Sequence, residues 1–238
     1  MAVFLFFGGS EAHPRAWDRC RACLEAGGHT SRVIDWVQAP WEAGWPMAIG
    51  HLAREIGVVR DAVLVGHSMA GLFLSLLGEK IKARREIYLA ALVPHPGRTM
   101  YDRLFEGEEI FPPEWTALYQ ELMATPDHPL TRRKVEEFLF HDGPGDPYAG
   151  FWRPFPLPLD LFYDVDFPLM ALAPRPRHYI VCSEDRTVCP QWQRKAALEL
   201  REASRAAAFP LPFTELATGH SPHVTRPQEL AALLEALA

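Results

Sequence analysis

The sequence predicts an α/β protein with a mostly parallel sheet of about six strands and helices on both faces of the sheet. Three observations lead to this prediction: a continuous apolar run at residues 2–7, regular alternation of short apolar runs with helical patterns, and a break in this alternation between residues 98 and 176. Buried parallel strands are nearly continuous apolar runs, and strands that alternate with helices indicate a parallel sheet. A chain of 238 residues can bury a sizeable core as one domain with an insertion.

The expected elements follow one another closely along the chain. Residues 2–7 form the first strand, and Pro14–Ala26 form a helix with proline in its first turn and Gly27-Gly28 just past its end. The later strands are expected at Thr30–Val37, Ala62–Val65, Ile87–Val93, His178–Cys182 and Phe213–Ala217. The later helices are expected at Met47–Ile56, Ser68–Lys80, Pro190–Ala206 and Pro227–Leu237.

Residues 98–176 are rich in proline and aromatic residues and carry no strand pattern. Helical patterns occur near Glu114–Ala124 and Arg132–Phe140. About eighty residues cannot form one plain loop in a compact domain. We therefore expect a mainly helical lid at 98–176, inserted into a core made of residues 1–97 and 177–238.

Composition excludes several classes of protein. The net charge of -6, with 24 basic residues scattered among 30 acidic ones, gives no footprint for nucleic acid or an anionic membrane. The apolar start of the chain is too short for a membrane span and lacks the features of a signal peptide, so a cytoplasmic location is expected. Four cysteines in a chain of this length are expected to be free thiols rather than a disulfide framework.

The stretch Gly66-His67-Ser68-Met69-Ala70-Gly71 lies between an expected strand and an expected helix. A nucleophile on such a strand-to-helix turn has a strained backbone, and its neighbours two positions away must be small. Gly66 and Ala70 are small, although alanine stands where glycine is usual. Ser68 is therefore a candidate nucleophile, and the alternative is a merely structural turn.

A serine nucleophile needs a histidine base and a carboxylate that orients the base, in the chain order serine, acid, histidine for this type of turn. Asp185 follows the strand at His178–Cys182, and His220 follows the last strand. Both lie where the carboxyl ends of parallel strands gather functional residues. Glu184 and His223 are their competitors in the same loops.

Acyl transfer also needs two backbone N–H groups to hold the developing oxyanion. Met69, the residue after the nucleophile, supplies one, and Ser10, after Gly8-Gly9, is the candidate for the other. The alternative is that Gly8-Gly9 is only a tight turn.

With these residues assigned, the chain resembles the α/β-hydrolase superfamily, and within it the small esterases similar to plant methylesterases, hydroxynitrile lyases and their bacterial relatives. The resemblance covers nearly the whole chain and is carried by the Ser68 stretch, Tyr88–Pro94, Tyr179–Asp185, Gly219–Pro222 and Arg226–Leu230.

This resemblance implies a function for each candidate. Ser68, Asp185 and His220 match the catalytic triad of the family, and the N–H groups of Ser10 and Met69 match its oxyanion hole. Gly9 and Ser221 occupy the places where the lyases have threonine and lysine, which favours ester hydrolysis over cyanohydrin cleavage.

The predicted function is cleavage of a small carboxylic ester by a serine hydrolase that needs no cofactor and no metal. Gly9, Trp115, Tyr119 and Trp152 are candidate substrate-binding residues, although the aromatic ones are equally suited to the core of the lid. The expected partner is a small-molecule ester, and a homodimer is left open. The alternatives are a lyase, thioesterase or carbon–carbon hydrolase of the same fold, and a binding protein that has lost catalysis.

Overall fold

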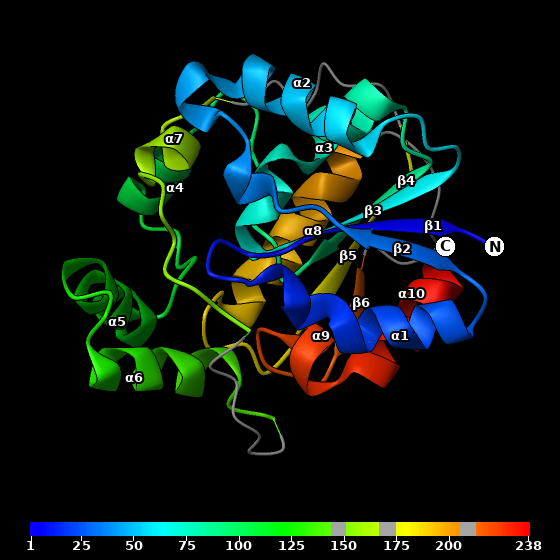
Figure 1. The fold of residues 1–238 in the computed structure, drawn as a ribbon. Helices are drawn as coiled ribbons and strands as arrows, with labels where there is room; N and C mark the ends of the chain where they lie inside the picture. The colour runs from blue at the N-terminus through cyan, green and yellow to red at the C-terminus, as the bar shows by residue number, and fades with distance from the viewer. Residues whose placement is uncertain (144–150, 167–174, 205–212) are drawn as a thin grey trace.

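The computed structural model describes residues 1–143, 151–166, 175–204 and 213–238. Within them the strands form one sheet of six parallel strands in the order β2-β1-β3-β4-β5-β6 (Figure 1). The strands are β1 Val3–Phe7, β2 Thr30–Val33, β3 Ala62–His67, β4 Arg85–Leu89, β5 Arg177–Cys182 and β6 Phe213–Leu216. The predicted parallel α/β fold is confirmed.

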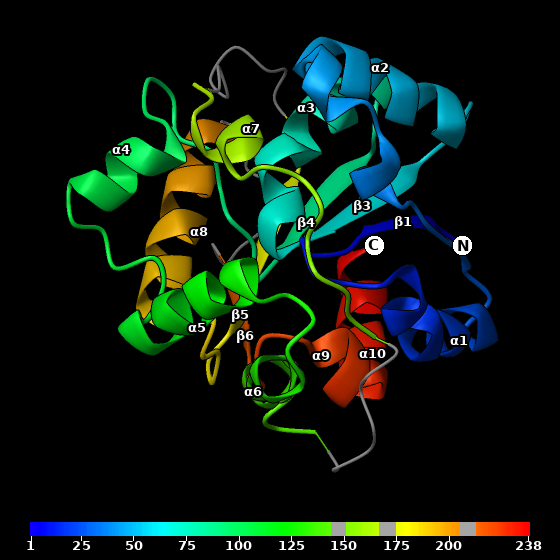
Figure 2. The ribbon, with the colours of Figure 1, turned by 60° about the vertical axis from the view of Figure 1, so that its left-hand side comes forward.

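Helices cover both faces of this sheet (Figures 1 and 2). On one face lie α2 Trp45–Ile56, α3 Gly71–Ile81 and α8 Pro190–Ser204, and on the other lie α1 Asp18–Ala26, α9 Pro222–Thr225 and α10 Pro227–Leu237. Short 3₁₀ turns add η1 Pro14–Trp17, η2 Trp36–Gln38, η3 Trp41–Ala43 and η4 Ser68–Ala70.

The strands supply both halves of the core because successive side chains point to opposite faces. Leu5 and Phe7 pack in the cluster formed with α2, α3 and α8, whereas Phe4 and Phe6 pack with α1 and α10. All four side chains are fully buried. A continuous apolar run is therefore the pattern expected of a strand that is covered on both faces.

Prolines begin many of the helices. Pro stands in the first turn of η1, α2, α5, α6, α9 and α10, and Pro190 is the first residue of α8. The first N–H groups of a helix have no intrahelical acceptor, so the missing proline N–H costs nothing there. Many of the chain's 22 prolines thus position helices rather than interrupt them.

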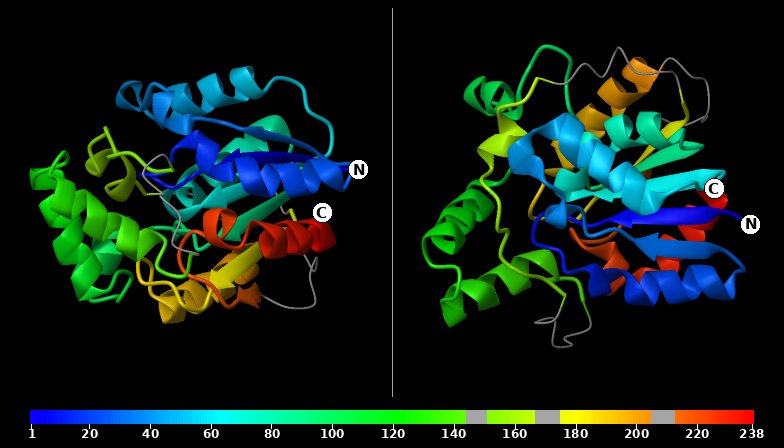
Figure 3. Two further views of the ribbon diagram at one scale, coloured as in Figure 1. Left: turned by 60° about the horizontal axis from the view of Figure 1, so that its bottom comes forward. Right: turned by 45° about the horizontal axis from the view of Figure 1, so that its top comes forward.

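The described residues between β4 and β5 include four helices, which lie at the end of the sheet to which the strands point and opposite both termini (Figures 1 and 3). They are α4 Met100–Phe105, α5 Pro113–Ala124, α6 Pro129–Leu139 and α7 Asp160–Tyr163. Thr99 and Asp102 form a reciprocal capping box at the start of α4. Leu118, Val135 and Trp152 belong to a separate apolar cluster between α5 and α6, which includes Val224 of α9.

Two strands, β2 and β4, each end four residues before the expected boundary. β2 ends at Val33 rather than Val37, because the chain turns into η2, where the Trp36 indole N–H donates to the Gly8 carbonyl at 2.7 Å. β4 covers Arg85–Leu89 rather than Ile87–Val93, because Ala90 has a φ of 43° and turns the chain out of the sheet. The last residues of the helix expected at Pro190–Ala206 lie outside the described residues.

The helices in the described part of the chain include none that is both long enough and apolar enough to span a membrane. All four cysteines are free thiols, with Cys20 and Cys182 buried.

Candidate active site

Ser68 lies on a sharp turn between β3 and α3, at the carboxyl end of the central strand β3. Its φ is 55°, a left-handed backbone conformation that is uncommon for any residue other than glycine. The Leu92 N–H donates to the Ser68 carbonyl at 2.9 Å, so the chain leaving β4 holds the turn in place. This strained geometry is typical of a nucleophile presented above a parallel sheet.

The close approach at this turn occurs at Gly71 rather than at Ala70. A Cβ atom on Gly71 would lie 2.2 Å from the Leu92 carbonyl oxygen and 2.8 Å from the Ala91 Cβ. A Cβ on Gly66 would meet the Leu74 side chain at 3.0 Å. The turn accommodates the Ala70 methyl group in the core, and the following glycine lets α3 pack against the chain beyond β4.

Asp185 and His220 come together at the ends of β5 and β6. The His220 Nδ1–H donates to Asp185 Oδ2 at 2.7 Å. Asp185 Oδ2 also accepts from the Gln193 amide at 2.8 Å, and its Oδ1 accepts from the Thr187 and Val188 N–H groups at 2.7 and 3.1 Å. Since the carboxylate orients Nδ1–H, the Nε2 atom of His220 is left as the basic nitrogen.

The competing residues of the two loops make other contacts. Glu184 is exposed, and its carbonyl accepts from the His141 ring at 3.0 Å. His223 is buried and stacks on Trp17 at 4.2 Å between ring centroids. Burial, together with nearby His220, lowers the pKa of His223 to about 3, so this ring is neutral at neutral pH.

His67 joins three segments of the site. The Gly9 N–H donates to its Nδ1 at 3.2 Å, and its Nε2–H donates to the His220 carbonyl at 2.8 Å. Burial and the neighbouring His220 and His223 lower the pKa of His67 well below its ordinary value, which keeps the ring neutral for this arrangement. His67 therefore ties the loop after β1 and the histidine loop to the turn that carries Ser68.

The loop after β1 passes directly over Ser68. A Cβ on Gly9 would lie 3.0 Å from the Ser68 Cβ and 3.2 Å from the His67 Nδ1, so a side chain here would press on the turn that carries Ser68. Ser10, the next residue, and Met69 line the same cavity as Ser68. Met69 is the second residue of η4, where N–H groups have no intrahelical acceptor. Both N–H groups considered for the oxyanion thus belong to segments packed around the serine.

Two cavities meet at Ser68. The larger, of about 280 Å³, is mostly apolar and contains Trp115 and Tyr119 of α5 in its wall. The smaller, of about 20 Å³, is lined by Gly9, His220 and Trp152 among others. The Trp152 indole N–H donates to Glu136 at 2.9 Å, which fixes that ring. All four candidate substrate-binding residues therefore border a cavity that Ser68 also lines.

Two acidic residues near the site, Glu11 and Asp142, are not among the candidate site residues predicted from the sequence. Glu11 is buried and lines both cavities. Asp142, at the end of the α6 segment, accepts from the hydroxyls of Thr218 and Thr225 at 2.7 and 3.1 Å, next to the His220 loop. The burial of each residue depends on segments distant in the sequence.

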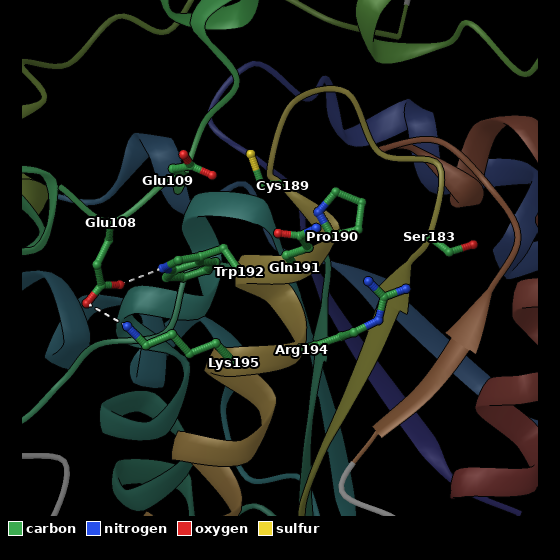
Figure 4. A pocket seen from close by; sticks show the side chains of 9 residues that line it. All are labelled: Glu108, Glu109, Ser183, Cys189, Pro190, Gln191, Trp192, Arg194 and Lys195. Atoms are coloured by element: carbon green, nitrogen blue, oxygen red, sulfur yellow. Dashed lines mark hydrogen bonds and ion pairs between the residues drawn. The ribbon is translucent and has the colours of Figure 1, made fainter.

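A third cavity, of about 640 Å³, lies away from Ser68 beside the start of α8 (Figure 4). Its Lys195 ammonium pairs with Glu108 at 3.1 Å, and Glu108 also accepts from the Trp192 indole at 2.8 Å. Arg194 pairs with Glu215 at 2.7 Å. Lys195 and Arg194 are thus both paired with carboxylates, and Ser68 is not among the residues that line this cavity.

Among the residues with a described position, no cluster of three or more His, Cys, Asp or Glu side chains could hold a metal ion.

A serine on a left-handed turn between a central parallel strand and a helix is typical of the α/β-hydrolase class. The model of the alpha/beta hydrolase family matches residues 5–233, and the chain belongs to this family.

Individual relatives are more distant. "Probable esterase PIR7A" of Oryza sativa subsp. indica is 31% identical over 109 residues, which are 41% of this chain and 41% of the rice protein. The match thus spans about two fifths of that curated relative. "Probable hydrolase R7" of Phoma sp. is 26% identical over 185 residues, which are 75% of this chain and 70% of that protein.

The crystal structure of polyneuridine aldehyde esterase superimposes with a TM-score of 0.72 at 18% identity, covering 100% of this chain and 99% of that chain. At this identity the likeness establishes the fold alone. The family and the names of these relatives support a hydrolase in general.

Proposed function

We propose that the protein is a serine hydrolase that cleaves a small carboxylic ester through an acyl-enzyme on Ser68. The observation that carries the proposal is the arrangement of Ser68 on a left-handed turn, in a cavity shared with His220, whose Nδ1–H is held by Asp185 at 2.7 Å. The relatives named as esterases support the same reaction class.

In the proposed mechanism, His220 Nε2 takes the proton from the Ser68 hydroxyl as the oxygen attacks the ester carbonyl. The N–H groups of Ser10 and Met69 stabilise the oxyanion. His220 then protonates the departing alcohol, and a water molecule activated by the same ring releases the acid. Asp185 keeps the Nδ1–H tautomer and stabilises the cation that forms on the ring.

The size of the larger cavity supports a small substrate. Its volume of about 280 Å³ lies at the lower end of the range for small-molecule pockets. Its apolar wall suits the alkyl or aryl part of an ester. We further propose that residues 98–176, whose described helices supply much of this wall, act as the lid of the site.

The test is covalent labelling by a fluorophosphonate, followed by hydrolysis of p-nitrophenyl esters of rising acyl length. We expect the wild type to be labelled and Ser68→Ala to be unlabelled, with kcat lower by about 10⁶-fold. Absence of label on a folded wild-type protein would favour a binding protein. A labelled protein without ester turnover would favour another reaction of this fold.

A further inference from the structure

Glu11 is a buried carboxyl group at the candidate active site that the proposed mechanism does not use. Its side chain lines both the larger and the smaller cavity beside Ser68, although the residue is only 7% exposed. It follows Ser10, whose N–H is assigned to the oxyanion. A carboxylate in this place therefore faces the substrate rather than bulk water.

Glu11 has no cationic partner in the described part of the chain. The Ser10 hydroxyl donates to Oε2 at 2.6 Å, and the nearby Tyr119 hydroxyl also lowers the pKa of the Glu11 carboxyl group as a hydrogen-bond partner. Both of these partners are neutral, and Oε1 is buried. None of the ion pairs between described residues includes Glu11. Burial raises the pKa of Glu11, which favours the neutral acid as long as no cation lies beside it. A cation bound in the cavity would stabilise the charged carboxylate and supply the partner that a buried charge needs.

On the side of the larger cavity, the wall beside Glu11 is aromatic and lacks positive charge, whereas the smaller cavity contains His220. The larger cavity is lined by Tyr101, Phe111, Trp115, Tyr119 and Tyr163, and no Lys, Arg or His is among its described lining residues. Burial, and next the negative charge of Glu11, raise the pKa of both Tyr119 and Tyr163, which places these two rings within its field. The faces of aromatic rings attract cations, most strongly where water is excluded.

The position of Glu11 also affects the proposed reaction. An unpaired carboxylate near Ser10 would repel the oxyanion that the Ser10 N–H is expected to hold. A positive group on the substrate would neutralise the carboxylate and remove this repulsion. The same group would satisfy Oε1 and rest against the rings.

We propose that the larger cavity selects esters that carry an ammonium group, with Glu11 as the residue that binds this cation. The inference rests on the proposed serine esterase function, because it assigns the substrate class of the same site. It requires no change in the triad chemistry.

The test compares acetylcholine with 3,3-dimethylbutyl acetate, its uncharged carbon isostere, by titrating the acid released. We expect kcat/KM for the cationic ester to exceed that of the isostere by at least about tenfold in the wild type, as for one charge-assisted contact. In Glu11→Gln the ratio is expected to fall to near one, because the cationic ester loses its advantage over the neutral ester. Glu114→Gln, at the exposed start of α5, is the matched control and should keep the wild-type ratio.

A second measurement needs no variant: choline should inhibit p-nitrophenyl acetate hydrolysis more strongly than 3,3-dimethylbutanol does. A wild type that hydrolyses both esters equally, or a ratio that survives Glu11→Gln, would overturn the cation site alone. A wild type that neither hydrolyses any of the esters nor reacts with fluorophosphonate would overturn the proposed function and this inference with it.

Discussion

Asp185 at the carboxyl end of the sheet and Glu86 at the amino end are both buried carboxylates, and their partners differ. At the carboxyl end, Asp185 accepts from two backbone N–H groups, the Gln193 amide and His220. At the amino end, Glu86 of β4 accepts from the Arg177 guanidinium of β5 at 2.8 Å and from the Ser75 hydroxyl of α3 at 2.6 Å.

The difference lies in whether the partner can change its charge. Arginine stays protonated in proteins, so the Glu86–Arg177 pair is a permanent neutralised contact between neighbouring strands. Histidine gains and loses a proton near neutral pH, so Asp185 can stabilise a charge that exists only during a reaction. A buried carboxylate thus supports stability or chemistry according to its partner.

Asp185→Asn gives the largest expected effect. The amide nitrogen would favour the wrong tautomer of His220, and we expect kcat to fall by about 10⁴-fold. Single-turnover hydrolysis of a p-nitrophenyl ester measures the loss, with circular dichroism as the check on folding. A loss below tenfold in a folded variant would remove Asp185 from the proposed triad.

Glu86→Gln should have the opposite profile. Removing one member of a buried ion pair costs about 3–5 kcal/mol in the free energy of unfolding, because it leaves the other charge uncompensated. Urea denaturation measures this loss, and kcat of the folded fraction should stay at the wild-type value. The matched control is Glu215→Gln, which breaks the exposed pair with Arg194 and should cost about 1 kcal/mol or less. A fall in kcat with Glu86→Gln would show that the two ends of the sheet are coupled.

The helix α3 connects both ends and has a glycine at each. A Cβ on Gly71 would press on the Leu92 carbonyl at 2.2 Å, and a Cβ on Gly78 would press on Glu86 Oε1 at 2.3 Å. We expect each of the substitutions Gly71→Ala and Gly78→Ala to lower the free energy of unfolding by about 1–3 kcal/mol. Only Gly71→Ala should also lower kcat. Thermal denaturation and esterase assays of the two variants separate these outcomes. Equal activity in both variants would contradict the assignment of Gly71 to the nucleophile turn.

The last expected effect is gradual, a pH dependence of stability that arises at the carboxyl end. Burial depresses the pKa of His67 and of His223, the latter to about 3 from an ordinary value of 6.5. Below pH 6.5 these two histidines bind protons in the unfolded chain but stay unprotonated in the folded protein, so the free energy of unfolding decreases as the pH falls. Between pH 6.5 and 5, each ring lowers the free energy of unfolding by up to about 1.4 kcal/mol per pH unit.

Urea denaturation at several pH values measures this slope. His223→Phe keeps a ring beside Trp17 and should lower the slope by the contribution of one histidine. A free energy of unfolding that is flat over this range in the wild type would mean that both rings are protonated in the folded protein.

Much of the fold could be predicted because its signals are local. The apolar run at residues 2–7 and the alternation of strands with helices determine a parallel sheet, and the carboxyl ends of parallel strands lie at one edge. Ser68, Asp185 and His220 each follow a predicted strand, so the topology alone places them near one another. The predicted ends of β2 and β4 were wrong for two reasons. The chain leaves β2 for a tertiary contact between the Trp36 indole and the Gly8 carbonyl, and it leaves β4 through the backbone turn at Ala90, and apolar patterns encode neither.

The sequence by itself therefore determined the fold class and the order of the candidate triad, since both depend on periodicity and on the positions of residues at strand ends. Only the tertiary structure decided that His67 joins the loops of Gly9 and His220, and that Glu11 is buried without a cation between two cavities. The physical reason is that burial and pairing are properties of segments packed against each other. The residue type of Glu11 does not distinguish it from an exposed surface glutamate. The role proposed for its carboxyl group depends on the aromatic wall contributed by α4, α5 and α7.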